Sequence, residues 1–436
     1  MKKTRTIKID TLARVEGEGS LFLRVKNGKI SSARLKIFEP PRFFEAFLRG
    51  RSYEEAPDLT SRICGICPVA YQMSAVHAIE DIFGFQASPL VRSLRRLLYC
   101  GEWIESHALH VYLLHAPDFL GYDGAAEMAG DYPSEVERGL QLKKAGNAIL
   151  EMLGGRSVHP INVRVGGFYR IPSRKDILPL VEILKKARKA AIETVRWTAS
   201  FPFPDFERDY LFVSLRHTDE YPMNEGRVVS GNGLNIPVKE FSRHFEEQQV
   251  SHSTALHSVF KGSGIYFAGP LARYNLNYDL LPPSIKKAAG DSGVGSSCRN
   301  PFKSVIVRSL EILYACEEAL EILTHYDPSP SFSSPRVKGV EGEGCAITEA
   351  PRGILYHHYR VDRDGLIQSA TIIPPTSQNQ KVMEEDLAAW AGRFLDLPDE
   401  KLRWKCEQAI RNYDPCLSCS THYLKLHVDR SDVADA

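Results

Sequence analysis

The sequence predicts a mainly helical α+β protein whose N- and C-terminal regions converge on one buried site. Three observations support this prediction. Apolar residues recur at helical spacing through several long central segments, segments of alternating polarity occur near both ends, and each end carries a Cys-x-x-Cys pair. Because no compositional boundary isolates either pair in a module of its own, we expect a single domain spanning residues 1–436.

The composition is that of an ordinary globular protein. The chain has 436 residues, of which 43% are apolar and 25% charged, and its formal net charge is +1. This charge gives no electrostatic reason to expect nucleic acid or an acidic membrane as a partner. No apolar run reaches the roughly 20 residues that span a bilayer, and the first residues lack the apolar core of a secretory signal. We therefore expect a cytoplasmic protein with no membrane span.

Residues 1–60 are expected to be rich in β-structure. Apolar and polar residues alternate over 21–25, Asn27-Gly28 is a typical hairpin turn, and the alternation resumes over 30–37. This pattern predicts two paired strands near the start of the chain.

Residues 61–330 are expected to form a helical body. Ser88-Pro89 is typical of an N-cap and first turn, and it opens an apolar-periodic segment that continues through His115. Similar periodicity marks Glu135–Leu153, Asp176–Ala199 and Ser304–His325. These segments are long enough to predict a bundle of core helices.

The remaining region, residues 331–422, follows a stretch rich in Pro and Ser, Asp327–Pro335. Here Asp364-Gly365 joins two segments that are typical of strands, Ile354–Val361 and Ile367–Ile373. The region therefore predicts a second hairpin, and it ends with the second cysteine pair.

The two cysteine pairs, Cys64/Cys67 and Cys416/Cys419, are the main chemical signal. Two thiolates at i and i+3 can bind one ion when the first lies in a turn and the second opens a helix. Thiols stay reduced in the cytosol, so metal ligands are expected rather than a disulfide framework. The other five cysteines lack ligand spacing and are expected to be small buried hydrophobes: Cys100, Cys298, Cys316, Cys345 and Cys406.

From their spacing alone, the four cysteines allow either a catalytic metal or a closed four-cysteine zinc site. Zinc ribbons keep their pairs within roughly a few tens of residues in a small module. Here the pairs lie near opposite ends of a long chain with ample core, which favours a metal held by the whole fold.

The residues around both pairs carry a resemblance. Arg62-Ile-Cys-Gly-Ile-Cys67 and Asp414-Pro-Cys-Leu-Ser-Cys-Ser-Thr-His422 together resemble the paired signature of the large, catalytic subunit of nickel-iron hydrogenases. Three further motifs fall in that family's order: Arg14-Val-Glu-Gly17, Ala350-Pro-Arg-Gly353 and Pro374-Pro-Thr-Ser-Gln-Asn379. The resemblance thus covers nearly the whole chain and implies the large-subunit fold, with its long-helix bundle core.

Two other segments resemble the cytosolic, multi-subunit branch that is linked to pyridine nucleotides and includes the sulfhydrogenases. They are Ser157-Val-His-Pro-Ile-Asn162 with the following Gly166-Gly167, and the stretch from Gly101 through His107 to His115-Ala-Pro-Asp118. This resemblance implies reversible heterolytic cleavage of H2, with electrons passed to NAD(P).

The resemblance also implies a ligand set. All four cysteines would bind nickel, Cys64 and Cys416 terminally, while Cys67 and Cys419 would also bridge to an iron that carries carbonyl and cyanide ligands. Dihydrogen is a very weak acid, so its splitting needs a metal pair to hold hydride and a base to take the proton. Cys416 would be that base, and Glu16 would be the first carboxylate of the proton path. Without the resemblance, Glu16 is typical of a solvated acid in a turn.

Residues around the metal pair follow from the same resemblance. Arg352 would stand over the open metal position, held by Asp118 and Asp414, because a buried cation without partners costs several kcal/mol. Thr376 would donate a hydrogen bond to a cyanide ligand. Pro374 would shape the apolar pocket around the diatomic ligands, although a Pro-Pro-Thr sequence alone indicates only a turn.

A magnesium ion is implied as well. Glu45 and His422 match the family's ligands, joined by a backbone carbonyl near 372–373, assigned to Ile373, and by waters. Such a site would hold the C-terminal region against the N-terminal region. Outside this context, Glu45 is typical of an exposed helix acid.

Tyr71 departs from the family pattern. Tyr71 occupies a position where the family commonly has a histidine, and tyrosine cannot shuttle protons near neutral pH.

In the family a maturation endopeptidase cuts after the final motif histidine, once nickel-insertion proteins have delivered the metal. Residues 423–436 are therefore expected to be a cleaved C-terminal extension.

Electron transfer is expected to need other polypeptides. No cysteine spacing remains for an iron-sulfur cluster, and no glycine-rich nucleotide fingerprint follows an expected strand. The implied partners are an iron-sulfur small subunit docked near the Cys64/Cys67 face and diaphorase subunits that bind flavin and NAD(P).

Two alternatives stay open at this point. One is a non-catalytic redox-coupling subunit like the related quinone-site subunit of respiratory complex I, whose members have generally lost the nickel cysteines. The other is a structural four-cysteine zinc protein. Infrared bands from carbonyl and cyanide ligands would discriminate among all three.

Overall fold

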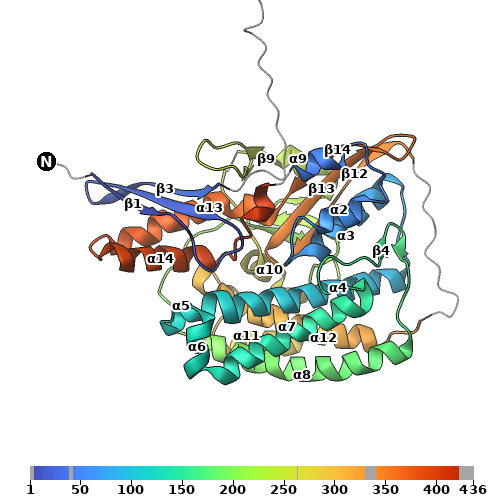
Figure 1. The fold of residues 1–436 in the computed structure, drawn as a ribbon, viewed down its shortest axis with the longest axis horizontal. Coiled ribbons are helices and arrows are strands. Elements are labelled where there is room, and N and C mark those ends of the chain that lie inside the picture. Colours follow the sequence, from blue (N-terminus) through green and yellow to red (C-terminus); the bar gives the residue numbers. More distant parts are fainter. Residues whose placement is uncertain (1–3, 39–42, 263, 329–339, 422–436) are drawn as a thin grey trace, which may run out of the picture.

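Two layers make up the molecule, a bundle of long helices and a layer of small sheets and shorter helices. The structure is a computed structural model that describes residues 4–38, 43–262, 264–328 and 340–421. Figure 1 shows the long helices α4, α7, α8 and α12 in the lower half, and the sheets with α3, α13 and α14 above them. The expected α+β class and the helical core are therefore confirmed.

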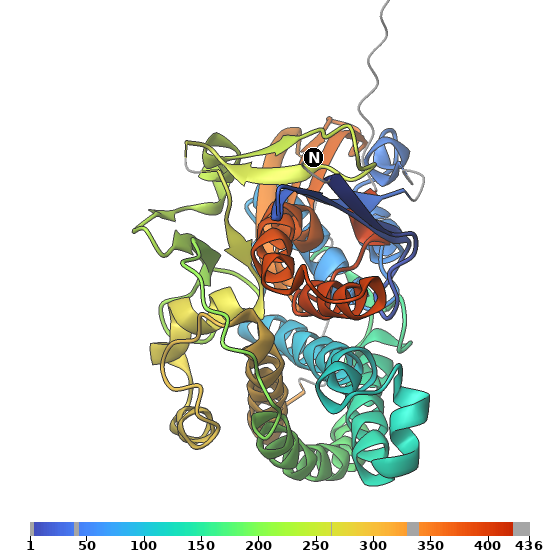
Figure 2. The same cartoon turned by 90° about the vertical axis from the view of Figure 1, so that its left-hand side faces the viewer.

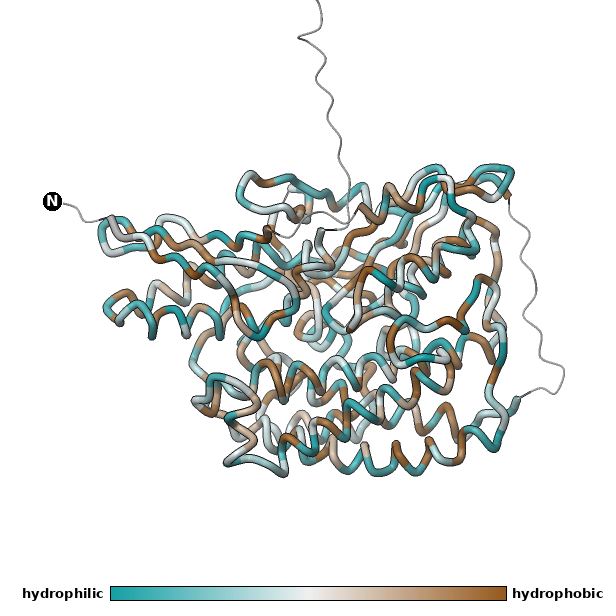
Figure 3. The backbone as a smooth tube through the Cα atoms, in the orientation of Figure 1, coloured by the Kyte–Doolittle hydropathy of each residue, from teal (hydrophilic) through white to brown (hydrophobic). Residues whose placement is uncertain are grey.

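The helical layer follows the apolar periodicity of the sequence. Its long members are α4 (Pro89–Ala108), α7 (Pro133–Gly154), α8 (Arg174–Ala199) and α12 (Ser304–Thr324). Ser88 caps α4, since its Oγ accepts the N–H of Val91 at 3.3 Å. The segment expected to run through His115 continues beyond α4 as a π-helical turn, η1 (Leu109–His115), and then as α5 (Ala116–Leu120). Figure 3 shows hydrophobic residues recurring along these helices.

Helices α4 and α7 pack with their backbones close together. A Cβ atom on Gly146 of α7 would lie 2.5 Å from the carbonyl oxygen of Gly101 and 2.7 Å from the amide nitrogen of Glu105, both in α4. Only glycine fits at this contact, because neither helix backbone can yield to a methyl group.

The N-terminal sheet consists of three antiparallel strands in the order β1 (Thr4–Ile9), β2 (Gly19–Lys26), β3 (Lys29–Ile37). The expected turn at Asn27-Gly28 is present, with φ angles of 57° and 71°. Two short helices follow, α1 (Phe44–Leu48) and α2 (Ala56–Ser61). The β-rich character expected for the first 60 residues is thus found mainly in its first 37.

The C-terminal sheet contains the second expected hairpin. Its antiparallel order is β12 (Gly342–Ala350), β13 (Gly353–Val361), β14 (Ile367–Ile373). Helix α3 (Pro68–Ile82) packs on this sheet, where Ser74 Oγ and Thr348 Oγ1 are hydrogen-bonded at 2.8 Å. After β14 the chain forms α13 (Pro375–Ala391), α14 (Asp399–Arg411) and the 3-10 turn η6 (Ser418–Thr421). Figure 2 shows α13 and α14 between the N-terminal sheet and the helical layer.

The expectation of a helical body over 61–330 is wrong for its middle part. Between α8 and α10 (Pro270–Asn277) the chain forms a four-stranded sheet, β11-β6-β7-β8, and a separate pair, β9 with β10. The strands are β6 (Phe212–Arg216), β7 (Arg227–Ser230), β8 (Asn235–Ile236), β9 (Phe245–Gln248), β10 (His257–Phe260) and β11 (Phe267–Ala268). Strands this short carry too few alternations to be recognised from the sequence.

Smaller elements complete the connections. They are α6 (Ala125–Asp131), α9 (Phe241–His244), α11 (Pro283–Asp291), β4 (Val163–Arg164), β5 (Gly167–Phe168) and the 3-10 turns η2 (Val238–Glu240), η3 (Tyr278–Leu280), η4 (Pro301–Lys303) and η5 (Gly392–Phe394). Within the described ranges, every helix is too short or too polar to cross a bilayer.

Gly146→Ala tests the close contact between α4 and α7. The added methyl group meets backbone atoms of α4, so we expect the free energy of unfolding to fall by about 1–3 kcal/mol. Gly290→Ala in α11 is the matched control, because a Cβ there meets nothing within 4 Å. The control should be neutral or stabilising by about 0.5–1 kcal/mol. Equal midpoints for both variants in urea denaturation would contradict the tight contact.

Candidate metal centre

The two cysteine pairs are positioned by the ends of different elements. Cys64 lies in the turn before α3, and Cys67 is the N-cap residue of that helix, followed by Pro68 at its first position. Cys416 follows α14, and Cys419 lies in η6. Their sulfur atoms belong to segments that are far apart in the sequence but adjacent in the fold.

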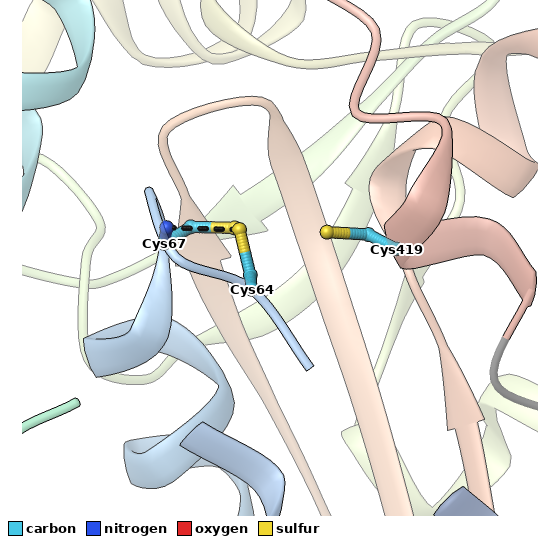
Figure 4. A group of neighbouring side chains, drawn as sticks. All are labelled: Cys64, Cys67 and Cys419. Carbon is cyan, nitrogen blue, oxygen red and sulfur yellow. Dashed lines mark hydrogen bonds between the residues drawn. The ribbon is translucent and has the colours of Figure 1, made fainter. Parts of the chain in front are cut away.

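All four sulfur atoms gather at one buried point. Cys64 Sγ lies 2.7 Å from Cys67 Sγ and 3.8 Å from Cys416 Sγ, and the sulfurs of Cys64, Cys67 and Cys419 lie within 4.8 Å of one another. Figure 4 shows Cys419 reaching from the C-terminal segment toward the Cys64/Cys67 turn. Each of the four residues is at most 4% exposed. The expected convergence of the two pairs is therefore present.

The second pair departs from the expectation of separate thiols. The sulfurs of Cys416 and Cys419 are bonded to each other in this structure. Both must be thiolates to bind a metal ion, so the metal-bound state requires this pair to be reduced.

The Cys64 sulfur is the best stabilised anion of the first pair. It accepts hydrogen bonds from the backbone N–H groups of Cys67 at 3.0 Å and Ile66 at 3.3 Å. Burial alone raises the pKa of the Cys64 thiol, but the Cys67 hydrogen bonds and the charge of Arg352 outweigh it and lower this pKa below its usual value. Burial and the neighbouring Cys64 instead raise the pKa of Cys67.

Glu16 is joined to the second pair by both backbone and side chain. Residues Glu16 and Cys416 form a parallel β-bridge, and the N–H of Leu417 donates to the carbonyl of Glu16 at 2.8 Å. Glu16 Oε2 lies 3.0 Å from Cys416 Sγ, and it accepts a hydrogen bond from the N–H of Ser418 at 3.2 Å. The expected neighbourhood of Glu16 and Cys416 is therefore present, and the partly exposed Glu16 lies between the buried sulfurs and the surface.

Arg352 and Asp414 form a buried pair beside the sulfurs. Arg352 donates from Nε to the carbonyl of Asp414 at 2.6 Å and from Nη2 to its Oδ1 at 3.1 Å. Its Nη1 has no hydrogen-bond partner among the described residues. Asp414 has a φ of 51°, a left-handed conformation that Asp tolerates better than most residues. This geometry turns the Asp414 carbonyl and carboxylate toward the same guanidinium.

A second buried arginine fixes the turn that carries Arg352. Arg273 Nη1 donates to the carbonyl of Ala350 at 2.7 Å, and Nη2 donates to that of Pro351 at 3.0 Å. Its charge is balanced by Glu311 and Glu349, at 2.9 Å and 2.8 Å. The position of Arg352 thus depends on a fully buried ion network.

The expectation that Asp118 holds Arg352 is wrong. Asp118 instead accepts from Arg411 Nε and Nη2 at 2.7 Å each and from Arg14 Nη2 at 2.6 Å. It also accepts from His115 Nδ1 at 3.1 Å and from Trp404 Nε1 at 3.1 Å. Asp118 therefore ties α5 and α14 to the loop that carries Glu16, and it acts on the site through Arg14.

The residues expected around the diatomic ligands lie beside the second pair. Pro374 is the N-cap residue of α13, and Thr376 Oγ1 accepts the N–H of Cys416 at 3.1 Å. Because this contact uses the oxygen as an acceptor, the Thr376 hydroxyl hydrogen stays free to donate to another group.

The expected magnesium residues are brought together in part. Glu45 Oε1 accepts the N–H of Ile372 at 2.7 Å, so α1 lies beside the end of β14. The carbonyl of Ile373 accepts from Gln378 Nε2 at 3.2 Å. His422 lies outside the described residues, as does the extension 423–436.

Sequence reasoning missed two buried acids of α4. Glu102 accepts the N–H groups of Val69 and Ala70, at 2.6 Å and 3.1 Å, and so satisfies the start of α3 directly after Cys67. Burial raises its pKa well above the usual value. Glu105 pairs with Lys143 at 2.9 Å. The available signal was the position of both acids on the apolar face of a predicted core helix, where charged residues are rare.

The donor set fits a cluster of soft metal ions. Four sulfurs converge on one buried point, and thiolate is a ligand that soft and borderline metals prefer. The buried guanidinium of Arg352 stands beside them, and its Nη1 has no hydrogen-bond partner within the part of the chain that the structure describes, as expected next to an anionic ligand set. The residues present therefore fit a metal centre held by both ends of the chain.

Asp118→Asn tests the role assigned to the Asp118 network. Removing one partner of a buried ion pair should lower the free energy of unfolding by about 3–5 kcal/mol. Asp58→Asn, which removes the exposed pair with Arg62, should cost less than about 1 kcal/mol. A loss at Asp118 no larger than that at Asp58 in urea denaturation would contradict the network.

The same carboxylate predicts a pH dependence. Burial opposes ionisation, but the hydrogen bond from His115 and the charge of Arg411 hold the pKa of Asp118 well below its usual range. Its stabilisation is therefore complete above the unfolded-state pKa of about 4 and is lost as the pH falls toward the folded-state value. Between about pH 4 and pH 2, wild type should lose stability more steeply than Asp118→Asn.

Comparisons with known proteins agree with this geometry. A family model described as nickel-dependent hydrogenase matches residues 42–139 and 311–422. The alpha subunit of sulfhydrogenase 2 from Pyrococcus furiosus is 35% identical, with 96% of this chain and 100% of that protein covered. The beta subunit of the NAD-reducing hydrogenase HoxS from Cupriavidus necator is 27% identical, over 97% of this chain and 95% of that protein.

A solved structure supports the same assignment. The crystal structure of an NAD+-reducing [NiFe]-hydrogenase in the H2-reduced state has a TM-score of 0.86 and 28% identity, covering 96% of this chain and 99% of that one. The [NiFeSe] hydrogenase of Desulfovibrio vulgaris Hildenborough shares the fold, with a TM-score of 0.79 at 23% identity. Four sulfurs gathered from both ends of the chain, together with these similarities over nearly its whole length, establish that the chain belongs to the nickel-dependent hydrogenase family.

Proposed function

We propose that this chain is the catalytic subunit of a nickel-iron hydrogenase that cleaves H2 reversibly and heterolytically and passes the electrons through an iron-sulfur subunit to NAD(P). One observation carries the proposal: four cysteine sulfurs meet at a buried point, and one of them, Cys416 Sγ, lies 3.0 Å from the carboxylate of the partly exposed Glu16. When bound, nickel and iron supply two adjacent Lewis-acidic ions that accept the electron pair of the H–H bond.

The chain's own residues handle the proton. Cys416 Sγ takes the proton as the H–H bond breaks, and Glu16 Oε2, 3.0 Å away, receives it next. The N–H of Ser418 holds the Glu16 carboxylate in place at 3.2 Å. Because Glu16 is partly exposed, the proton can leave from it toward water or a partner surface.

Arg352 orients the substrate side of the site. Asp414 fixes the guanidinium through two hydrogen bonds, which leaves Nη1 for the substrate position. A permanently charged guanidinium cannot compete with Cys416 for the proton, so its role is electrostatic.

The iron ligands are proposed to be carbonyl and cyanide. Thr376 accepts from the N–H of Cys416 and so has its hydroxyl hydrogen available for a cyanide nitrogen. Pro374, directly before α13, would form the apolar wall beside them. Magnesium is proposed near Glu45 and the end of β14, with His422 as a further ligand.

The electrons require partner subunits. The five remaining cysteines stand apart, four of them buried, and none belongs to a metal-ligand group among the described residues. An iron-sulfur small subunit is therefore proposed as the immediate partner, with flavin- and NAD(P)-binding diaphorase subunits beyond it. The support is similarity to subunits of sulfhydrogenases and of an NAD-reducing hydrogenase. A cytoplasmic location and maturation by nickel insertion and C-terminal cleavage belong to the same proposal.

Glu16→Gln tests the proton path. Glutamine keeps an acceptor for the N–H of Ser418 but cannot carry the proton, so H2-dependent dye reduction should fall about 10²–10⁴-fold. Nickel and iron content should match wild type. Glu54→Gln, an exposed acid of the same N-terminal region, should keep full activity. Full turnover in Glu16→Gln would remove Glu16 from the path, and full turnover in Cys416→Ser would remove the proposed base.

Infrared spectroscopy of the purified complex tests the metal centre itself. Carbonyl and cyanide bands are expected, and a zinc protein or a non-catalytic relative would lack them. Thr376→Val should shift the cyanide bands because it removes the donor, whereas Thr376→Ser should leave them in place. Cyanide bands that are identical in wild type and Thr376→Val would contradict the role of Thr376.

A further inference from the structure

A second cluster of metal-binding side chains lies away from the four cysteines. His252 comes from the connection between β9 and β10, His257 begins β10, and Glu384 lies on α13. One ligand atom from each lies within 4.8 Å of those of the other two. His252 Nε2 and Glu384 Oε1 are 2.8 Å apart, and the two imidazole rings are 5.5 Å apart between centroids.

His257 contributes a buried nitrogen that the protein leaves unsatisfied. The residue is 2% exposed, and its Nε2 has no hydrogen-bond partner among the described residues. A buried polar atom without a partner is destabilising, and coordination of a metal would relieve this cost.

The surroundings orient the carboxylate and leave a route for an ion. The N–H of Leu35 in β3 donates to Glu384 Oε1 at 2.8 Å, which is the kind of outer contact that positions a metal ligand. The side chains of His252 and Glu384 are 18% and 14% exposed. An ion can therefore reach the cluster from solvent and keep a water molecule.

We propose that His252, His257 and Glu384 bind a zinc ion, with water in the fourth position. Two imidazoles and one carboxylate are a ligand set that zinc accepts in tetrahedral geometry. The absence of sulfur separates this site from the four-cysteine centre in ligand chemistry. No redox step is involved, because zinc keeps one oxidation state.

The ion would clamp three elements together: β3 through Leu35, the β9–β10 connection through both histidines, and α13 through Glu384. Helix α13 also carries Thr376, eight residues or about 12 Å before Glu384 along the helix axis. The zinc site would therefore brace the helix that supports Cys416.

The test uses the complete complex, which is purified without immobilised-metal affinity chromatography and then incubated with zinc sulfate. Elemental analysis should find zinc at a one-to-one ratio that Glu384→Gln and His252→Ala reduce, with affinity weakened at least about tenfold. X-ray absorption at the zinc edge should give nitrogen and oxygen neighbours at about 2.0–2.1 Å and no sulfur at about 2.3 Å. His325→Ala is the control, because it removes a histidine that is paired with a glutamate, Glu321, but is exposed.

Thermal unfolding gives an independent measure. Zinc should raise the midpoint of wild type and of His325→Ala, but not that of Glu384→Gln. Sulfur neighbours in the X-ray absorption spectrum of zinc would overturn the proposal, because the ion would then be bound by the cysteines. Unchanged zinc content or an unchanged zinc-induced shift in both cluster variants would overturn it as well.

Discussion

The pairing of residue 16 with residue 416 is the constraint on which the site depends. A parallel bridge and the hydrogen bond from Leu417 to Glu16 hold the N-terminal loop against the C-terminal cysteine loop. Backbone hydrogen bonds fix direction and register at once, so one contact places Cys416 Sγ beside Glu16 Oε2 and Cys419 opposite Cys64. A site built this way forms only when the whole chain has folded.

Buried ion pairs transmit that constraint through the fold. Asp118 binds Arg14 and Arg411, which ties the Glu16 loop to α14, and Arg273 binds Glu311 and Glu349 while it holds the turn before Arg352. Burying a charge is costly unless its partners are present. Each pair therefore disfavours any packing that separates the helical layer from the sheets, and this holds the residues around the four sulfurs in place.

Helix α13 links the metal centre to the rest of the upper layer. Its first turn places Thr376 against the N–H of Cys416, and Gln378 and Asn379 bond to neighbouring strands through Ile354 and Ala268. The proposed zinc clamp at Glu384 would fasten the same helix farther along. A helix held at its first turn and again near its middle would keep the hydroxyl of Thr376 at a fixed position relative to the sulfurs.

The sequence by itself determined the long helices, the two hairpins and the two cysteine pairs of the candidate metal centre, because helical periodicity, Asn-Gly and Asp-Gly turns and Cys-x-x-Cys spacing are local patterns. It failed where the signal was short or non-local. The strands between 212 and 268 are too brief to show a period, and Asp118 was assigned to the wrong arginine. Only the tertiary structure decided which arginine each carboxylate meets and which buried acid caps α3, since those partners lie up to hundreds of residues apart and are chosen by packing.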